Sequence, residues 1–236
     1  GAVQAGVLWL GDESHDNITS MTSSTSTIQG VEKSWGIYAY GFDELIYTNT
    51  AEGGLTAEGR QCGLRVDGSS YTHIKNASGL TITSTADTLE SGGAAVKMGF
   101  ANEVLILDSS KITLTGQQRA IYITESPPSQ SLTLTGTDYT AEINGLVESH
   151  GSVTFKAGGA VTVNGKIITS GYTRTEGGET KSFNGGVSNE ADTAAKDDIE
   201  VGDKGFLENW GKLTLASGKA ISAGANGTVV NYGELG

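Results

Sequence analysis

The stretch that decides the fold runs from residue 144 to residue 171 and reads NGLVESHGSVTFKAGGAVTVNGKIITSG. Its segment GLVESHG, from Gly145, returns as GKIITSG from Gly165. Related segments start at Gly185, Gly205 and Gly227, so the four intervals are 20, 20, 20 and 22 residues. Each segment has an aliphatic residue two positions after its first glycine and a small polar residue two positions later. A repeat of this kind predicts short strands that stack in parallel, one from each repeat.

Asparagine precedes four of the five glycines. Asn-Gly is a favoured turn dipeptide because both residues tolerate left-handed backbone angles. The sequence therefore predicts one structural turn that recurs at Asn144–Gly145, Asn164–Gly165, Asn184–Gly185 and Asn226–Gly227.

The alternation within the segments predicts which side chains face inward, because successive residues of a strand point to opposite faces. The aliphatic positions form one expected inward column, namely Val147, Ile167, Val187, Leu207 and Val229. The next inward column ends in three asparagines, namely Asn189, Asn209 and Asn231. Stacked amides can bond one another along the stacking axis, which predicts an asparagine ladder. The alternative is that these residues only bend the backbone at a corner.

Further apolar patterns predict two more limbs of the repeat. One is expected to contain Ile112, Leu132, Val153 and Leu213, and the other Ile121, Ala141, Val161 and Ile221. In the N-terminal half, one limb is predicted from the segments GIYA at Gly36, GLRV at Gly63, AVKM at Ala95 and AIYI at Ala120. Its wider spacing implies loops between the strands, and GLTIT from Gly79 marks a second limb there.

Together these patterns predict an all-β chain that forms a right-handed, single-stranded parallel β-helix, or β-solenoid. We expect about ten coils of roughly 20–25 residues, with three short strands per coil. The right hand follows from the general preference of parallel crossover connections. Residues 1–30 lack the repeat and are expected to be an N-terminal cap or leading strand. Residues 31–236 are expected to form one structural domain, with longer looped coils over 31–143 and regular coils over 144–236.

Composition limits the partners of this chain. Its formal net charge is −12, and such a surface repels nucleic acid and anionic lipid headgroups. No apolar run approaches the roughly 18 residues of a membrane helix, so we expect no membrane insertion in this segment. The only cysteine, Cys62, has Gly63 and Leu64 beside it, which favours a buried, unreactive thiol.

The chain begins at Gly1 rather than at methionine, which we interpret as the remnant of a tag or as a processed start. Lysine is scarce, while serine, threonine and glycine are abundant. These features indicate an extracellular bacterial protein, either secreted or attached to the cell surface.

Several segments resemble those of known surface proteins: GIYAYG from Gly36, GGLTAEG from Gly53, GLTIT from Gly79, KITLTG from Lys111 and SLTLTG from Ser131. They are similar to segments of β-helical carbohydrate-binding and adhesin-like surface proteins of anaerobic gut bacteria. More broadly, residues 30–236 resemble the pectate-lyase-like β-helix superfamily. The resemblance implies the parallel β-helix fold and a cell-surface or secreted setting. It carries over no catalytic residue, because no lyase-type motif is matched.

No catalytic constellation is predicted. The acidic residues form no recurring pair, the histidines are scattered and no GxSxG motif occurs. The acidic stretch 190–203 contains Asp192, Asp197 and Asp198, which are calcium candidates because hard cations prefer clustered carboxylates. The alternative is a solvated acidic loop. No other cofactor is expected.

One outward column of the repeat contains His150, Ser170, Glu190, Trp210 and Tyr232. Trp210 and Tyr232 fall on adjacent repeats and, with Phe206, predict an aromatic platform on which sugars could stack. The alternative is that these rings pack beneath a loop or cap the C-terminal end.

We therefore expect a non-catalytic module that binds an extended polysaccharide or mediates adhesion to a host or neighbouring surface protein. A neutral glycan is favoured, because the acidic surface repels anionic polymers. The alternatives are a polysaccharide lyase or glycoside hydrolase of the β-helix type, and a passive structural stalk.

Overall fold

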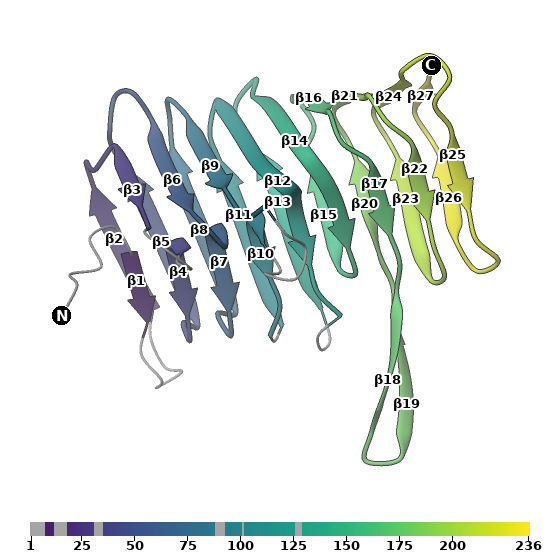
Figure 1. Cartoon of the computed structure of the whole chain (residues 1–236), viewed down its shortest axis with the longest axis horizontal. Coiled ribbons are helices and arrows are strands. Elements are labelled where there is room, and N and C mark those ends of the chain that lie inside the picture. The colour runs from purple at the N-terminus through teal and green to yellow at the C-terminus, as the bar shows by residue number, and fades with distance from the viewer. Residues whose placement is uncertain (1–7, 12–17, 31–34, 88–92, 101, 126–128) are drawn as a thin grey trace.

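Threonine, valine, isoleucine and leucine fill most strands of this chain, because branched side chains pack well on a pleated, half-buried surface. The computed structural model describes residues 8–11, 18–30, 35–87, 93–100, 102–125 and 129–236. Within these residues there are strands and no helix (Figure 1). They form one 16-stranded and one nine-stranded sheet, both parallel, and a separate two-stranded antiparallel hairpin.

The parallel strands fall into three series that the chain visits in turn. The first series contains β1 (Leu8–Gly11), β4 (Trp35–Tyr40), β7 (Cys62–Asp67), β10 (Ala94–Met98), the C-terminal parts of β12 (Lys111–Ile123) and β14 (Thr140–Ser149), β17 (Ile167–Thr169), β22 (Ile199–Val201) and β25 (Ile221–Ala223). Each strand pairs with the member of the same series that comes one circuit later, so neighbours in space are separated by about twenty to thirty residues in sequence.

The second series forms the nine-stranded sheet. It contains β2 (Ile18–Ser23), β5 (Glu44–Asn49), β8 (Tyr71–Asn76), β11 (Glu103–Asp108), β13 (Gln130–Thr135), β15 (Ser152–Phe155), β20 (Gly185–Asn189), β23 (Gly205–Asn209) and β26 (Thr228–Asn231).

The third series contains β3 (Thr27–Gln29), β6 (Leu55–Gly59), β9 (Leu80–Ser84), the N-terminal parts of β12 and β14, β16 (Ala160–Val163), β21 (Asp192–Ala195), β24 (Lys212–Leu215) and β27 (Glu234–Leu235). The long strands β12 and β14 continue from this series into the first, which joins the two into the 16-stranded sheet.

The core consists of the inward residues of all three series. Ile37, Leu105 and Ile112 come from the first, second and third series, and all are at most 1 % exposed within one continuous hydrophobic cluster. Cys62 is buried as predicted, with an exposed fraction of 2 %, and burial raises the pKa of its thiol to about 11. The thiol is therefore protonated at neutral pH and packs as a small apolar group.

Four residues of the inward aliphatic column predicted for the C-terminal half are buried, namely Val147, Ile167, Val187 and Leu207, but Val229 is 42 % exposed, and the five residues do not form one continuous column. Val147 pairs with Ile167 in the first series, as predicted. Val187 pairs with Leu207, and Leu207 with Val229, also as predicted, but these three residues lie in the second series. The predicted stacking of the Gly185 segment on the Gly165 segment is therefore wrong, because Ile167 pairs with Ile199 and Val187 with Val153. The burial of Leu207 between neighbours from the Gly185 and Gly227 segments is confirmed.

The cause of this error is the hairpin formed by β18 (Tyr172–Glu176) and β19 (Glu179–Phe183). It leaves the sheets after β17 and projects from them (Figure 1). The pair Val161 and Thr193 is 32 residues apart, whereas the preceding pair Ala141 and Val161 is 20 apart, so this circuit is longer by about the length of the hairpin. The apparent twenty-residue step from Gly165 to Gly185 therefore joins two different series.

Each of the two further limbs predicted from the sequence combines strands that belong to different series in the structure. Leu132 does stack on Val153, and Ala141 on Val161, as predicted. However, Ile112 pairs with Ala141, and Ile121 with Val147, so neither belongs where it was placed. The strands of the three series are similar in length and composition, which is why the sequence pattern assigned some of them to the wrong series.

The predictions for the N-terminal half were more accurate. Ile37, Leu64, Val96 and Ile121 stack in register along the first series. The GLTIT segment forms β9 in the third series. Residues 8–11, 18–23 and 27–29 already pair with β4, β5 and β6, so described strands are present within the expected cap region.

Candidate functional site

The predicted aromatic platform consists of two rings that cover each other. The ring centroids of Trp210 and Tyr232 lie 4.0 Å apart with an interplanar angle of 21°, and the two residues are 53 % and 61 % exposed. Each ring therefore uses one face to contact the other. Phe206 is the second residue of the strand Gly205–Asn209, which Trp210 follows, so the two lie about 13 Å apart at ~3.3 Å per residue. The ring of Phe206 lies close to Gly186. The described geometry thus assembles a pair and not a three-ring platform.

The three asparagines of the predicted ladder lie in register on β20, β23 and β26. Asn189 Nδ2 donates to Asn209 Oδ1 at 2.8 Å, and Asn209 Nδ2 donates to Asn231 Oδ1 at 2.6 Å. Asn189 and Asn209 are at most 2 % exposed. The stacked side-chain amides therefore satisfy one another's hydrogen-bonding groups inside the core.

A second pair of stacked amides was missed in the sequence. Asn76 Nδ2 donates to Asn49 Oδ1 at 2.6 Å across β5 and β8. Both side chains are at most 2 % exposed. The only sequence signal was that both asparagines end alternating strands 27 residues apart, without a following glycine.

The four Asn-Gly dipeptides occupy more than one kind of corner. Of their glycines, only Gly145 has a positive φ, at 130°. A Cβ atom at Gly165 would lie 2.2 Å from the carbonyl oxygen of Gly145, and one at Gly185 would lie 2.4 Å from that of Ser170. These glycines are therefore required by close backbone approach between stacked corners. Asn164 Nδ2 also donates to Asn144 Oδ1 at 2.6 Å, and Asn226 Nδ2 donates to Asp203 Oδ1 at 2.5 Å.

The calcium candidates do not converge. Lys219 Nζ lies 2.6 Å from Asp197 Oδ1 and 3.6 Å from Asp198 Oδ2, and this hydrogen bond lowers the pKa of Asp197. Asp192 begins β21 in a separate segment. Within the described ranges, no group of three or more histidine, cysteine, aspartate or glutamate side chains is placed to hold a metal ion. A cation at these aspartates would have to compete with Lys219.

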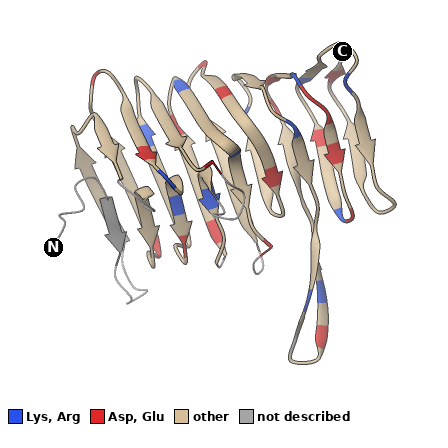
Figure 2. Cartoon of the chain, in the orientation of Figure 1, with Lys and Arg blue, Asp and Glu red and all other residues tan. Residues whose placement is uncertain are grey.

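A richer constellation lies on the outward face of the first series. Five residues occupy one column on the successive strands β4, β7, β10, β12 and β14, namely Tyr38, Arg65, Lys97, Tyr122 and Glu148. We call this column and its neighbours Trp35, Tyr40, Asp67 and Arg119 the aromatic–basic strip. At ~4.8 Å per strand, the column is about 19 Å long. Figure 2 shows basic segments on the adjacent strands β7 and β10.

The N-terminal half of the strip is organised around Arg65. Its guanidinium carbon lies 5.4 Å from the ring centroid of Trp35 and 5.5 Å from that of Tyr38. Its Nε lies 2.5 Å from Asp67 Oδ2, which also accepts a hydrogen bond from the Tyr38 hydroxyl at 3.2 Å. Burial, followed by the charge of Asp67, raises the pKa of Tyr38 to about 12. Tyr38 therefore remains a neutral hydrogen-bond donor at neutral pH.

The C-terminal half is organised around Arg119. Its guanidinium carbon lies 4.3 Å from the centroid of Tyr122, and its Nε donates to Glu148 Oε2. Glu148 Oε1 lies 3.7 Å from His150 Nε2. Hydrogen bonding, first from His150 and then from Arg119, lowers the pKa of Glu148 despite its partial burial. This carboxylate is therefore charged at neutral pH and accepts hydrogen bonds.

Lys97 joins the two halves. Its Nζ lies 5.6 Å from the centroid of Tyr122, and it forms no salt bridge with any carboxylate in the described residues. The strip therefore contains planar rings next to ion pairs. Each ion pair presents a hydrogen-bond donor beside an acceptor.

Unsatisfied polar atoms concentrate in this strip. Five buried side-chain nitrogen or oxygen atoms among the described residues lack a hydrogen-bond partner, and three of them are Trp35 Nε1, Asp67 Oδ1 and Arg119 Nη1. Leaving such an atom unpaired costs about 1–3 kcal/mol. Buried polar atoms without a partner are expected at functional sites, where a ligand can supply the missing hydrogen bond.

A larger hollow lies away from the strip. It measures about 590 Å³ and is lined mainly by short polar residues, including Thr48, Asn76, Ser110 and Thr137, together with Lys75 and Asp108. It contains no aromatic side chain, so it offers no surface on which a sugar ring could stack.

The sequence contains a signal for the strip. The limb predicted from Gly36, Gly63, Ala95 and Ala120 fixes the inward residues, and the residue after each first aliphatic position then points outward. Those outward residues are Tyr38, Arg65, Lys97 and Tyr122. The aromatic residues predicted to face outward, Phe206, Trp210 and Tyr232, all lie in the C-terminal repeats instead.

Among the described residues there is no helix of the length and apolarity needed to cross a membrane. Comparisons with protein-family models, with curated proteins and with solved structures found no match to this chain.

Proposed function

We propose that this chain is a right-handed, single-stranded β-solenoid of the parallel β-helix type that works outside the cell and binds an extended, neutral polysaccharide without cleaving it. The three series of parallel strands, visited in turn, support the solenoid. The extracellular setting rests on composition and on the resemblance to bacterial surface proteins.

The aromatic–basic strip is the observation that carries the binding proposal. Sugars present apolar C–H faces and vicinal hydroxyl groups, which require aromatic rings and paired donors and acceptors, respectively. Tyr122 supplies a partly exposed ring, while the pairs Arg65–Asp67 and Arg119–Glu148 supply donors beside acceptors. These ion pairs neutralise most of the local charge, which favours a neutral glycan. The length of the column, about 19 Å, suits several consecutive sugar residues.

The pKa shifts in the strip favour binding over hydrolysis. A glycosidase needs a carboxylic acid whose pKa is raised so that it can donate a proton. The pKa of Glu148 is lowered instead, and the raised pKa values of Tyr38 and Tyr122 oppose their ionisation as bases. Each group is thus held in its ordinary ionisation state, as a recognition surface requires.

A glycan array with the purified protein tests the proposal. We expect retention of neutral, linear polysaccharides, and a loss of at least tenfold in affinity in the variants Tyr122→Ser and Lys97→Met. Tyr71→Ser and Lys75→Met are matched controls, because both residues face outward on β8 in the second series. They should leave the affinity unchanged.

Two results would contradict the proposal. If the folded protein binds nothing on a broad array, the strip is not a glycan site. If the protein releases reducing ends or unsaturated products from any bound polysaccharide, the protein is an enzyme of the lyase or hydrolase class.

A further inference from the structure

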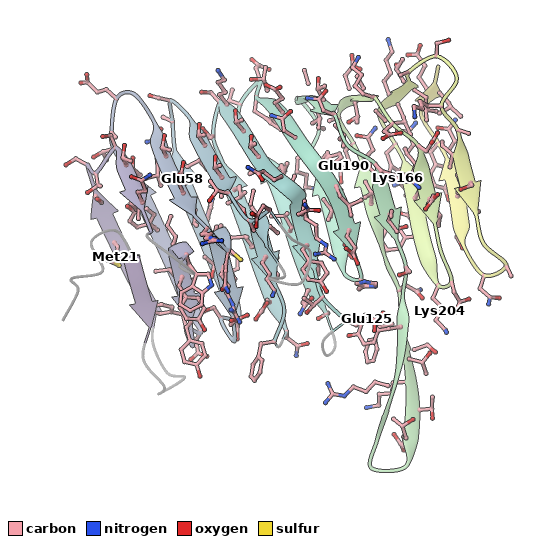
Figure 3. All side chains as sticks on the ribbon, in the orientation of Figure 1. Met21, Glu58, Glu125, Lys166, Glu190 and Lys204 are labelled. Carbon is pink, nitrogen blue, oxygen red and sulfur yellow. The ribbon has the colours of Figure 1, made fainter. Side chains whose placement is uncertain are left out.

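A small cavity lies at the base of the hairpin, next to the C-terminal end of the aromatic–basic strip. Its volume is about 70 Å³, and its lining includes Gln130, His150, Ser152, Tyr172, Phe183 and Asn184. We call it the hairpin-base pocket. Figure 3 labels Glu125 near the base of the hairpin. The pocket thus combines side chains of the second series with the first and last residues of the hairpin.

One wall of the pocket is aromatic. Tyr172 and Phe183 form the first cross-strand pair of the hairpin, and their rings stack with centroids 5.0 Å apart at an angle of 26°. Both residues are partly buried, whereas the described side chains between Thr173 and Ser182 are exposed. The base of the hairpin is therefore the part that packs against the sheets.

One residue of the pocket lining, Gln130, carries an unpaired hydrogen-bond donor. Gln130 is only 4 % exposed, and its Nε2 has no hydrogen-bond partner in the described structure. Gly151 packs against this residue so closely that a Cβ atom would lie 2.6 Å from the Gln130 carbonyl oxygen. The backbone of Gln130 is therefore tightly packed, and its side-chain amide nitrogen is buried without an acceptor.

His150 connects the pocket to the strip. Its Nε2 lies 3.7 Å from Glu148 Oε1, while its Nδ1 lies 3.0 Å from Ser170 Oγ and 3.6 Å from Glu125 Oε1. Both ring nitrogens therefore face protein groups. The two nearby carboxylates disfavour an anionic ligand group beside them.

The contents that fit the pocket follow from its size and lining. About 70 Å³ corresponds to roughly two water molecules, or a substituent of about four non-hydrogen atoms, and excludes a whole sugar ring. The aromatic wall requires an apolar part, and the unpaired Gln130 amide requires an acceptor. A hydroxyl group lacks the apolar part. An acetyl group has a methyl group and a carbonyl oxygen within this size.

We infer that the hairpin-base pocket holds the acetyl substituent of a sugar whose chain lies along the strip, so that the protein selects acetylated glycans. This inference rests on the proposed glycan binding. The acetyl carbonyl accepts from Gln130 Nε2, and its methyl group packs on Tyr172 and Phe183. N-acetyl and O-acetyl groups share this chemistry.

Two matched pairs of neutral oligosaccharides test the inference by titration calorimetry. The first pair is the β-1,4-linked hexamer of N-acetylglucosamine and that of glucose. The second pair is O-acetylated and unmodified xylohexaose. We expect the acetylated member of at least one pair to bind at least tenfold more tightly, and the two pairs distinguish an N-acetyl from an O-acetyl ligand.

The variant Gln130→Met keeps the length of the side chain and removes the donor, so it should abolish the preference within the pair that shows it. Gln117→Met is the matched control, because Gln117 is exposed on β12, and it should preserve the preference. If Gln130→Met does not fold, the side-chain amide signals of Gln130 in the labelled native protein should shift on addition of the acetylated oligosaccharide.

Equal affinities within both pairs would overturn the acetyl inference and leave glycan binding in place. No binding to any of the four sugars would overturn it as well, while the strip is judged separately on the broad array. A preference that survives in a folded Gln130→Met variant would show that the acetyl group is read elsewhere.

Discussion

Replacing Asn209 with alanine tests the amide ladder directly. Asn209 lies at the centre of the ladder and is 2 % exposed. Its Oδ1 accepts from Asn189, and its Nδ2 donates to Asn231 Oδ1 and, at 2.9 Å, to the carbonyl oxygen of Glu234. The substitution removes all three hydrogen bonds. It leaves Asn189 Nδ2 with the carbonyl oxygens of Ala191 and Lys212 as remaining acceptors.

The expected cost follows from these bonds. A buried hydrogen bond contributes about 1 kcal/mol net, so Asn209→Ala should lower the free energy of unfolding by about 3 kcal/mol. Asn231→Ala is the matched control at the exposed end of the ladder, where one accepted bond and one donated bond to Gly233 are lost. Because both lie near solvent, this change should cost only about 1 kcal/mol.

Urea unfolding followed by circular dichroism provides the measurement. Transition midpoints should be compared, because stacked repeats do not always unfold in one step. Asn209→Asp adds a second readout. Its buried carboxylate cannot donate at neutral pH, but it regains one donor when protonated, so this variant should become more stable relative to the native protein as the pH falls. If Asn209→Ala and Asn231→Ala cost the same, or if Asn209→Asp shows no such recovery, the ladder does not stabilise the fold.

The remaining predictions concern packing, the aromatic pair, pH and the hairpin. Leu207→Ala should cost about 2–5 kcal/mol in urea unfolding, because Leu207 is 2 % exposed, whereas Glu208→Ala on the outward face should change stability by less than about 0.5 kcal/mol. Joint replacement of Trp210 and Tyr232 with alanine should remove about 0.5–1.5 kcal/mol of ring stacking without weakening glycan binding, and a loss of binding would move the site to this pair. Burial lowers the pKa of His73 below its usual 6.5, so the unfolded chain binds the proton more readily. The stability contribution is present above pH 6.5 and is lost as the pH falls through the folded value, and His73→Gln should reduce this loss in thermal melts at a series of pH values. Limited trypsin digestion should cut first, within the described residues, after Arg174 and Lys181 in the exposed hairpin, and earlier cleavage within β4–β17 would contradict the structure.

The sequence carried enough information for the strands and their inward faces, and too little for the path of the chain. Period-two alternation identified Val147, Ile167 and Leu207 as inward residues, and all three are buried, because alternation is a local property of a strand. Which series a strand joins depends on what happens at the corners. The hairpin fills most of the interval between Thr169 and Gly185, so the twenty-residue spacing persisted across a change of series.

The candidate site was harder to predict for a similar reason. Tyr38, Arg65, Lys97 and Tyr122 are separated by 27, 32 and 25 residues, so they meet only after several irregular loops have been closed. Their alignment could be derived once the inward residues of the same limb were in register. The hairpin-base pocket could not be derived, because it joins Gln130 to Phe183 through a segment whose pattern gives no inward face.

The twelve-residue hairpin has a consequence for how such a chain can change. The strands before and after it keep their pairing, as Val161 on Thr193 and Ile167 on Ile199 show. The rest of the scaffold therefore tolerates an added segment at this corner, because the two ends of the segment need only lie next to each other. Loops of other lengths and compositions should be graftable between Gly171 and Asn184, which would make this corner a position where new recognition properties could evolve, or be engineered, while the underlying framework stays constant.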